Sequence, residues 1–206
     1  MLRPADPRAI ALRERYVIKA IPMLNPDGVY LGHTRSDSRG EDLNRAYAAP
    51  THHEHPSIFA AMAVARQLHE RGVLLAYIDA HALPSRRGCV FFSNRLSSEL
   101  MTEAELFTEL VALNSRWFDA TGGVVRDATG KNRRTARGSV FCMSGQPLVF
   151  TLECNYDGGT ATTLPPRHRA AALVADGRLS PEPPPPMDEE SLRFTPEVWQ
   201  EVGRAI

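Results

Sequence analysis

Hydrophobic and polar positions along this chain follow two different patterns. Short, nearly continuous apolar runs, which are typical of buried strands, occupy residues 16–24, 73–80, 89–93, 139–143 and 148–154. Apolar residues at helical spacing, or capping residues, predict helices over residues 5–15, 57–71, 97–120 and 195–206. Strands that alternate with helices predict a sheet covered on both faces. We therefore expect an α/β fold, an α/β/α sandwich with a mixed central sheet.

Capping and turn residues set the ends of several predicted elements. Asp6 is a candidate N-cap with Pro7 at the first helical position, and Gly72 is a natural stop for the helix before it. The polar, basic stretch 121–137 predicts a loop. Near the C-terminus, the run 181–186 (PEPPPP) predicts a stiff polyproline connector before the last helix.

Length and composition indicate one domain with a substantial core. The chain has 206 residues and is 43% hydrophobic, so we expect a single domain over residues 1–206. The 24 basic residues are balanced by 24 acidic ones, and the absence of a net positive field argues against a nucleic-acid partner. No apolar run approaches the roughly 20 residues that a membrane helix needs, so no membrane partner is expected.

Cysteine usage points to a compartment. The three cysteines, Cys89, Cys142 and Cys154, are an odd and sparse set without CxxC spacing. Such a set indicates buried free thiols in a reducing compartment rather than disulfides or a zinc knuckle. Charged residues follow Met1 at once, so no signal peptide is expected. These features predict a cytoplasmic protein.

A long polar loop follows the first predicted strand. It opens with the sequence NPDG at residues 25–28, which predicts a turn with a positive φ at the glycine. Arg35, Arg39, Asn44 and Arg45 come next. Guanidinium groups beside a side-chain amide are suited to holding a carboxylate by paired, charge-assisted hydrogen bonds. A solvated, salt-bridged loop is the alternative.

Two side chains at strand ends are candidates for chemistry. His81 follows the run 73–80, and imidazole is the commonest metal ligand, although a structural, hydrogen-bonded histidine is the alternative. Glu153 lies near the end of the run 148–154, where a carboxylate is costly to bury unless it is paired, so a functional role is a fair hypothesis.

Two further polar clusters have simpler interpretations. The loop histidines His52, His53 and His55 are interpreted as surface residues, with a metal cluster as the alternative. Five basic residues precede the Glu153 strand, namely Arg126, Lys131, Arg133, Arg134 and Arg137. They form either a solvated loop or the positive pocket for an acidic side chain.

The order of these residues resembles one family. LNPDGV followed by GxxR and GxDLNR, YIDAH ending at His81, and LECNY around Glu153 resemble the zinc carboxypeptidase superfamily and, within it, the cytosolic carboxypeptidases. The resemblance implies Zn²⁺ as cofactor, His81 as a zinc ligand and Glu153 as the general base. It also implies that Arg35 polarises the scissile carbonyl, while Asn44 and Arg45 grip the terminal carboxylate of the substrate.

The implied activity is that of the branch that trims glutamates from tubulin. Such an enzyme removes C-terminal or branch glutamates from acidic polypeptides, so tubulin tails are the expected partner. The implied location is cytoplasmic, and association with microtubules is left open.

Residues 1–206 depart from the family pattern in three ways. The His-Pro-Gly-Glu motif that supplies the other two zinc ligands is absent, as is the family's N-terminal β-sandwich, and Ala82 stands where a second histidine is expected. We therefore expect a partial catalytic domain, truncated at both ends, with two ligands upstream of residue 1 and no activity by itself. The alternative is an inactive remnant that binds acidic C-terminal tails without zinc.

Overall fold

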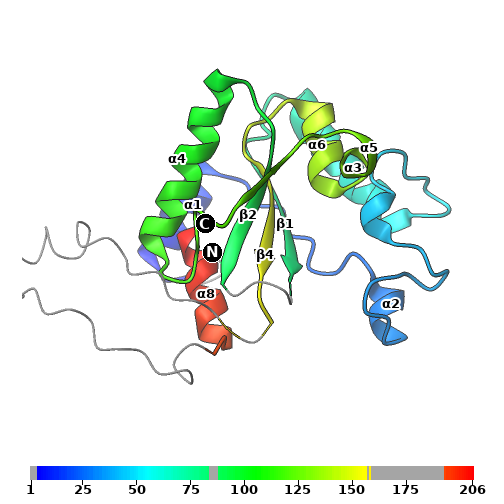
Figure 1. Ribbon diagram of the computed structural model, residues 1–206, viewed down its shortest axis with the longest axis horizontal. Coiled ribbons are helices and arrows are strands. Elements are labelled where there is room, and N and C mark those ends of the chain that lie inside the picture. Colours follow the sequence, from blue (N-terminus) through cyan, green and yellow to red (C-terminus); the bar gives the residue numbers. More distant parts are fainter. Residues whose placement is uncertain (1–3, 84–87, 157, 159–192) are drawn as a thin grey trace, which may run out of the picture.

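The computed structural model describes residues 4–83, 88–156, 158 and 193–206 (Figure 1). The helices are α1 (Pro7–Arg15), α2 (Pro26–Tyr30), the 3-10 helix η1 (Leu43–Arg45), α3 (Pro56–Glu70), α4 (Ser98–Asn114), α5 (Gly130–Arg133), α6 (Ala136–Ser144) and α8 (Pro196–Ala205). The strands are β1 (Tyr77–Ala82), β2 (Cys89–Asn94), β3 (Val124–Arg126) and β4 (Val149–Cys154). The predicted connector at 181–186 lies outside the described residues.

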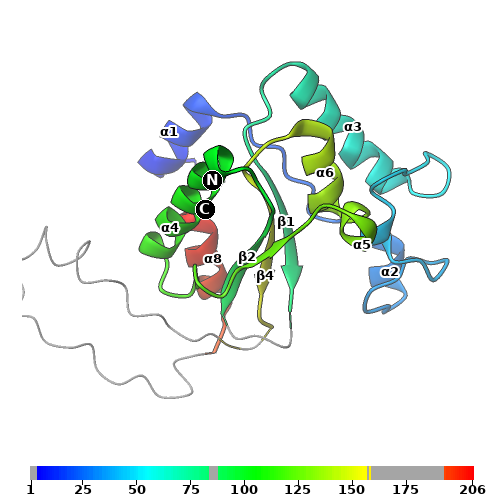
Figure 2. The same cartoon turned by 45° about the horizontal axis from the view of Figure 1, so that its top comes forward.

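The strands form one mixed sheet in the order β1-β4-β2-β3. Strand β4 pairs with β1 in parallel and with β2 in antiparallel orientation, while β3 runs parallel to β2. Helices α3 and α6 cover one face and α4 and α8 the other, as the two views in Figure 1 and Figure 2 show. The predicted α/β/α sandwich with a mixed central sheet is confirmed.

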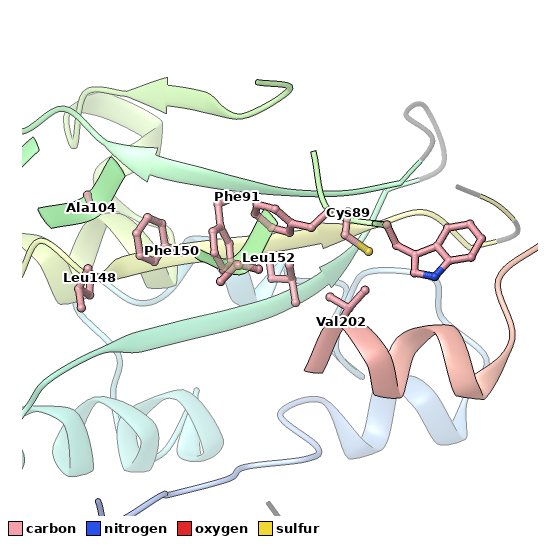
Figure 3. Close-up of a cluster of buried hydrophobic side chains, with 10 residues drawn as sticks. Cys89, Phe91, Ala104, Leu148, Phe150, Leu152 and Val202 are labelled. Atoms are coloured by element: carbon pink, nitrogen blue, oxygen red, sulfur yellow. The ribbon is translucent and has the colours of Figure 1, made fainter. Parts of the chain in front are cut away.

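Side chains along β4 alternate between the two faces and build two cores. Phe150 and Leu152 belong to a cluster with residues of α4 and α8, including Ala104 and Val202 (Figure 3). Val149 belongs to a second cluster with residues of α3 and α6. Odd-numbered residues of β4 therefore face α6, which places Glu153 on the α6 side of the sheet.

Three predicted helices are confirmed with small shifts. Helix α1 begins at Pro7 with Asp6 as its N-cap, because the Asp6 side chain accepts a hydrogen bond from the Arg8 N–H. Helix α3 ends before Gly72, whose φ is +68°. Helix α8 lies within the range predicted for the last helix, 195–206. The helix predicted over 97–120 ends earlier, at Asn114. Within α4, only Ala104 and Val111 are buried.

The strand predicted over residues 16–24 is wrong. This segment pairs with no strand among the described residues, and its apolar side chains are largely exposed, with Val17 at 81%. A strand needs a neighbour to satisfy its N–H and C=O groups and to cover its faces, and no such neighbour is described here. Leu24 alone packs against the second cluster, and its carbonyl accepts a hydrogen bond from Ser57 Oγ.

The strand predicted over 139–143 is a helix, α6. Thr135 caps its start by accepting from the Gly138 N–H, and Gly145, at φ +67°, caps its end. A short apolar run cannot by itself distinguish a strand from a buried helical turn. The loop predicted over 121–137 likewise contains β3 and α5, and the strand predicted from residue 73 begins only at Tyr77.

Among the described residues, no helix is long and apolar enough to cross a membrane.

Candidate active site

The carboxyl ends of β1 and β4 bring two predicted site residues together. In the parallel β1–β4 register, His81 lies opposite Glu153. Directly paired residues of neighbouring strands project from the same face, so the imidazole and the carboxylate lie side by side on the α6 side. Both side chains are partly buried. This edge of the sheet is where open α/β folds place their ligands.

The His81 ring is fixed through one nitrogen. Nε2 lies 2.7 Å from Asp79 Oδ2 and 3.3 Å from Asn44 Nδ2. Because a carboxylate only accepts, Nε2 carries the proton in the contact with Asp79. A metal would therefore bind through Nδ1, in the arrangement in which a carboxylate orients a histidine ligand from its other nitrogen.

Asn44 connects the polar loop to helix α6. Its Oδ1 accepts a hydrogen bond from the Ala136 N–H at 2.9 Å, in the first turn of α6. Asp42 caps η1 by accepting from the Asn44 N–H at 2.9 Å. Arg134 Nε donates to the Arg45 carbonyl at 3.0 Å. The loop is thus held against the start of α6 through Asn44 and against Arg134, just before α6, through the Arg45 carbonyl.

Asp42 joins the two predicted substrate-binding arginines. Arg35 Nε and Nη2 each lie 2.8 Å from Asp42 Oδ2, and Arg45 Nε lies 3.9 Å from the same oxygen. Arg35 is mostly exposed, so further guanidinium donors are free to face solvent or a substrate. Arg45 also lines a cavity of about 370 Å³ with His55 and Arg134.

Electrostatics couple these groups. Burial lowers the pKa of His81, but the hydrogen bond that His81 donates to Asp79 and the charges of Asp79 and Glu153 outweigh it, so the His81 pKa is raised. Burial raises the pKa of Glu153, and Asp79 adds to this, while His81, Arg35 and Arg137 oppose it. The charge of Arg35 acts on both His81 and Glu153, which places Arg35 with the pair.

Arg137 is the one member of the predicted basic stretch that is buried at this site, with 4% of its surface exposed. Its Nη1 donates to Ser93 O at 2.8 Å and to Asn94 Oδ1 at 2.7 Å, and its Nε has no partner among the described residues. Burial and the charge of Arg126 lower the pKa of Arg137, although the charges of Asp79 and Glu153 oppose this change. A buried guanidinium therefore lies within electrostatic reach of the His81–Glu153 pair.

The residues that could hold a metal are few. No group of three or more His, Cys, Asp or Glu side chains suited to a metal ion occurs in the part of the chain that the structure describes. His55 bonds instead to Glu41 Oε2 at 2.9 Å, and His52 packs edge-on against Phe59. His81 fits a zinc ligand, but the donor set around it is incomplete within the described residues.

We expect Asp79→Asn to lower the pKa of His81 in the metal-free chain. The folded pKa lies above the unfolded value of 6.5, so the ion pair stabilises the fold fully below pH 6.5. This contribution is lost as the pH rises through the folded pKa. NMR titration of the imidazole measures the shift, and Asp127→Asn, which breaks an exposed pair with Arg95, is the matched control. An unchanged His81 pKa in Asp79→Asn would contradict the assignment.

The start of the polar loop differs from its prediction. Residues 26–30 form α2, with Asn25 Oδ1 accepting from the Gly28 N–H at 3.1 Å, and Gly28 has no positive φ. Glycine is needed here for space, because an added Cβ would clash with the Asn25 side chain and the Ser36 carbonyl. Asn25 Nδ2 donates to that same carbonyl at 3.0 Å, which anchors the segment leading to Arg35.

We expect Gly28→Ala to lower the free energy of unfolding by about 1–3 kcal/mol, because backbone must move to admit the methyl group. Gly203→Ala in α8 is the control, since nothing lies within 4 Å of its added Cβ. That change should leave stability equal or raise it by up to about 1 kcal/mol. Urea unfolding measures both, and equal effects would contradict the steric explanation.

Comparisons with known proteins indicate the family of this chain. The zinc carboxypeptidase family matches residues 1–70. The whole chain aligns over 303 residues with cytosolic carboxypeptidase-like protein 5 of Rattus norvegicus, at 30% identity and over 36% of that protein. The chain belongs to the zinc carboxypeptidase superfamily. It spans about a third of the length of the curated relatives that it matches throughout.

Two further comparisons extend the likeness to sequence and fold. Cytosolic carboxypeptidase 6 of Caenorhabditis elegans is 37% identical over 107 residues, which cover 51% of this chain and 23% of that protein. The crystal structure of a metallo-carboxypeptidase from Burkholderia cenocepacia superposes with a TM-score of 0.72. That match covers 98% of this chain and 45% of the other at 20% identity, so it shows the zinc carboxypeptidase fold alone.

The sequence did not single out two carboxylates of this candidate site, Asp79 and Asp42. Asp79 precedes His81 by two residues, and this spacing on a strand places both side chains on one face. This two-residue spacing could have indicated from the sequence that Asp79 lies beside His81. Asp42 belongs to the DLNR motif, but nothing in the sequence indicates that it joins Arg35 to Arg45.

Proposed function

We propose that this chain carries the general base and the substrate-binding residues of a zinc-dependent metallocarboxypeptidase. The proposed reaction is the removal of C-terminal or branch glutamates from acidic protein tails such as those of tubulin. The observation that supports this most is the pairing of His81 with Glu153 at the carboxyl ends of parallel strands, with the Asn44 amide nitrogen 3.3 Å from His81 Nε2.

The chain's own residues divide the work. Glu153 takes a proton from the attacking water and returns it to the leaving amine, a role that suits a carboxylate whose pKa is raised by burial. Arg35 donates to the oxygen of the scissile carbonyl as negative charge develops there. Asn44 and Arg45 bind the terminal carboxylate, which restricts cleavage to the end of a chain.

Zinc, when bound, would act as a Lewis acid at this site. His81 would hold it through Nδ1, and Asp79 would keep the ring in place. The relatives that support the family assignment are named cytosolic carboxypeptidases, and we extend that location to this chain, with microtubules as the proposed place of action.

The preference for glutamate is supported by Arg137. Its guanidinium is buried, its described hydrogen bonds go to neutral oxygens, and its Nε is unpaired among the described residues. An acidic side chain brought beside it would complete a buried ion pair and offset the desolvation of both charges. A neutral side chain offers no such compensation.

A second candidate function is binding without catalysis. The absence of a three-ligand cluster among the described residues favours a protein that grips acidic C-terminal tails through Arg35, Asn44 and Arg45 but does not cut them. Both candidates use the same loop, so binding alone does not separate them.

Zinc content and glutamate release, measured together, test the two candidates. For residues 1–206 alone we expect less than one zinc per chain and no glutamate release, because one imidazole does not hold the ion. A longer polypeptide that contains this chain and a His-x-x-Glu motif should bind one zinc and release glutamate. If that polypeptide binds Glu-ended peptides without cutting them, the binding function is correct. One tightly held zinc in residues 1–206 would show that another residue, with His52, His53 or His55 as the first suspects, completes the site.

A further inference from the structure

Two cysteines from distant parts of the chain lie directly opposite each other. In the antiparallel β2–β4 register, Cys89 is paired with Cys154. The strands that carry them are separated in sequence by α4, β3, α5 and α6. Both cysteines are free thiols.

The backbone around this pair has the geometry of a non-hydrogen-bonded pair. The Cys89 N–H donates to Trp117 O at 2.9 Å, and the Cys89 carbonyl accepts from Asp119 N at 2.8 Å. The Cys154 carbonyl accepts from Leu83 N at 2.8 Å. The neighbouring residues Gly88 and Asn155 form the hydrogen-bonded pair instead, through Asn155 N and Gly88 O at 3.0 Å.

Non-hydrogen-bonded pairs bring their side chains closest together. Their Cα atoms lie about 4.5 Å apart, and a disulfide spans Cα separations of about 4.4–6.8 Å. Cys89 and Cys154 also share the face of the sheet that packs on α4 and α8 (Figure 3 shows Cys89 there). The strands therefore already hold the two sulfur atoms in position for a bond.

We propose that Cys89 and Cys154 are a redox modification site, at which a low-molecular-weight disulfide such as oxidised glutathione forms a reversible cross-strand bridge. Cys154 is partly exposed, whereas Cys89 has no exposed surface, so Cys154 is the residue that meets the oxidant. Its thiolate attacks one sulfur of the oxidant and releases one small thiol. Cys89 then attacks Cys154 Sγ, and its proton passes to the second small thiol as that thiol leaves. Two protein thiols and one small disulfide thus become one protein disulfide and two small thiols.

The position of the bridge relates it to the catalytic site. Cys154 follows Glu153 on β4, and the two side chains project from opposite faces of the same strand. The bridge ties the end of β4 to β2 directly behind the candidate base. Cys142 takes no part, because it lies exposed on α6, on the other side of the sheet, with its Sγ 3.6 Å from Ala128 O.

Equilibration of the native 206-residue chain with mixtures of reduced and oxidised glutathione tests the proposal. After rapid alkylation, intact mass and peptide mapping should show a loss of two of the three free thiols, with a peptide that joins Cys89 to Cys154. Reduction should restore all three. Cys142→Ala, the matched control, should form the same bridge with no free thiol left.

The single variants separate the two steps. Cys89→Ala should stop at the first step and accumulate one glutathione on Cys154, while Cys154→Ala should form no bridge. Circular dichroism shows whether each variant is folded. Three alkylatable thiols at every glutathione ratio, or a bridge that includes Cys142, would overturn the proposal. So would a bridge that forms only after denaturant is added.

Discussion

Glu153→Gln is expected to reduce turnover by about a hundred-fold or more in an active, zinc-loaded protein that contains this chain, because glutamine cannot accept the proton of the attacking water. The amide has nearly the shape of the carboxylate, so the β1–β4 register and zinc content should be unchanged. Release of glutamate from Glu-ended peptides measures turnover, and elemental analysis measures zinc.

A control substitution at another carboxylate separates the loss of a general base from the loss of a negative charge. Glu41→Gln removes a carboxylate from the polar loop, where Glu41 bonds to His55, and should leave turnover within about threefold of the parent. Activity of Glu153→Gln within threefold of the parent would remove Glu153 from the mechanism.

The second large effect concerns selectivity. We expect release of C-terminal Glu to exceed release of Phe or Leu by about two orders of magnitude, because a site built to pair a buried charge rejects neutral side chains. Arg137→Gln should bring the two rates close together, mainly by slowing release of Glu. Comparison of kcat/KM for Glu-ended and Phe-ended peptides measures this change.

Arg133→Gln is the control for Arg137, since it removes the same charge from an exposed position on α5. It should leave the ratio of rates unchanged and weaken binding of acidic tails only at low salt, where exposed charges are poorly screened. If Arg137→Gln folds and keeps its preference for Glu, the acidic side chain is bound elsewhere.

The sequence predicted the strand-end positions of His81 and Glu153, but it did not predict all of the elements around them. His81 and Glu153 could be placed because each ends an apolar run, and parallel strands bring such ends together. The runs at 16–24 and 139–143 were misassigned because a short apolar run has no period that separates strand from helix. The first of these also depends on whether a neighbour pairs with it, which a local pattern does not contain.

Side-chain partners were the least predictable part. The contact between Asn44 and His81 joins residues 37 positions apart, and that between Asn44 and Ala136 joins residues 92 apart. Arg137 was one of five basic residues in its stretch, and only the fold shows that it alone of the five is buried and that its charge acts on Glu153. Such choices depend on how α6 packs, which no motif in the chain records.

The attachment of the polar loop to α6 has a consequence for hydrogen exchange. Glu153 lies on β4, which has a strand on each side, so its amide should exchange only in the larger opening events of the sheet. Asn44 and Arg45 lie on a segment held through Ala136, through Arg134 and through the bond from Arg39 to the Glu54 carbonyl. Opening this segment breaks only these few bonds, so it requires less free energy than opening the sheet. A bound C-terminal carboxylate should therefore slow amide exchange in residues 35–45 and leave that of β4 almost unchanged. The loop that binds the substrate is thus expected to be locally less stable than the strand that carries Glu153.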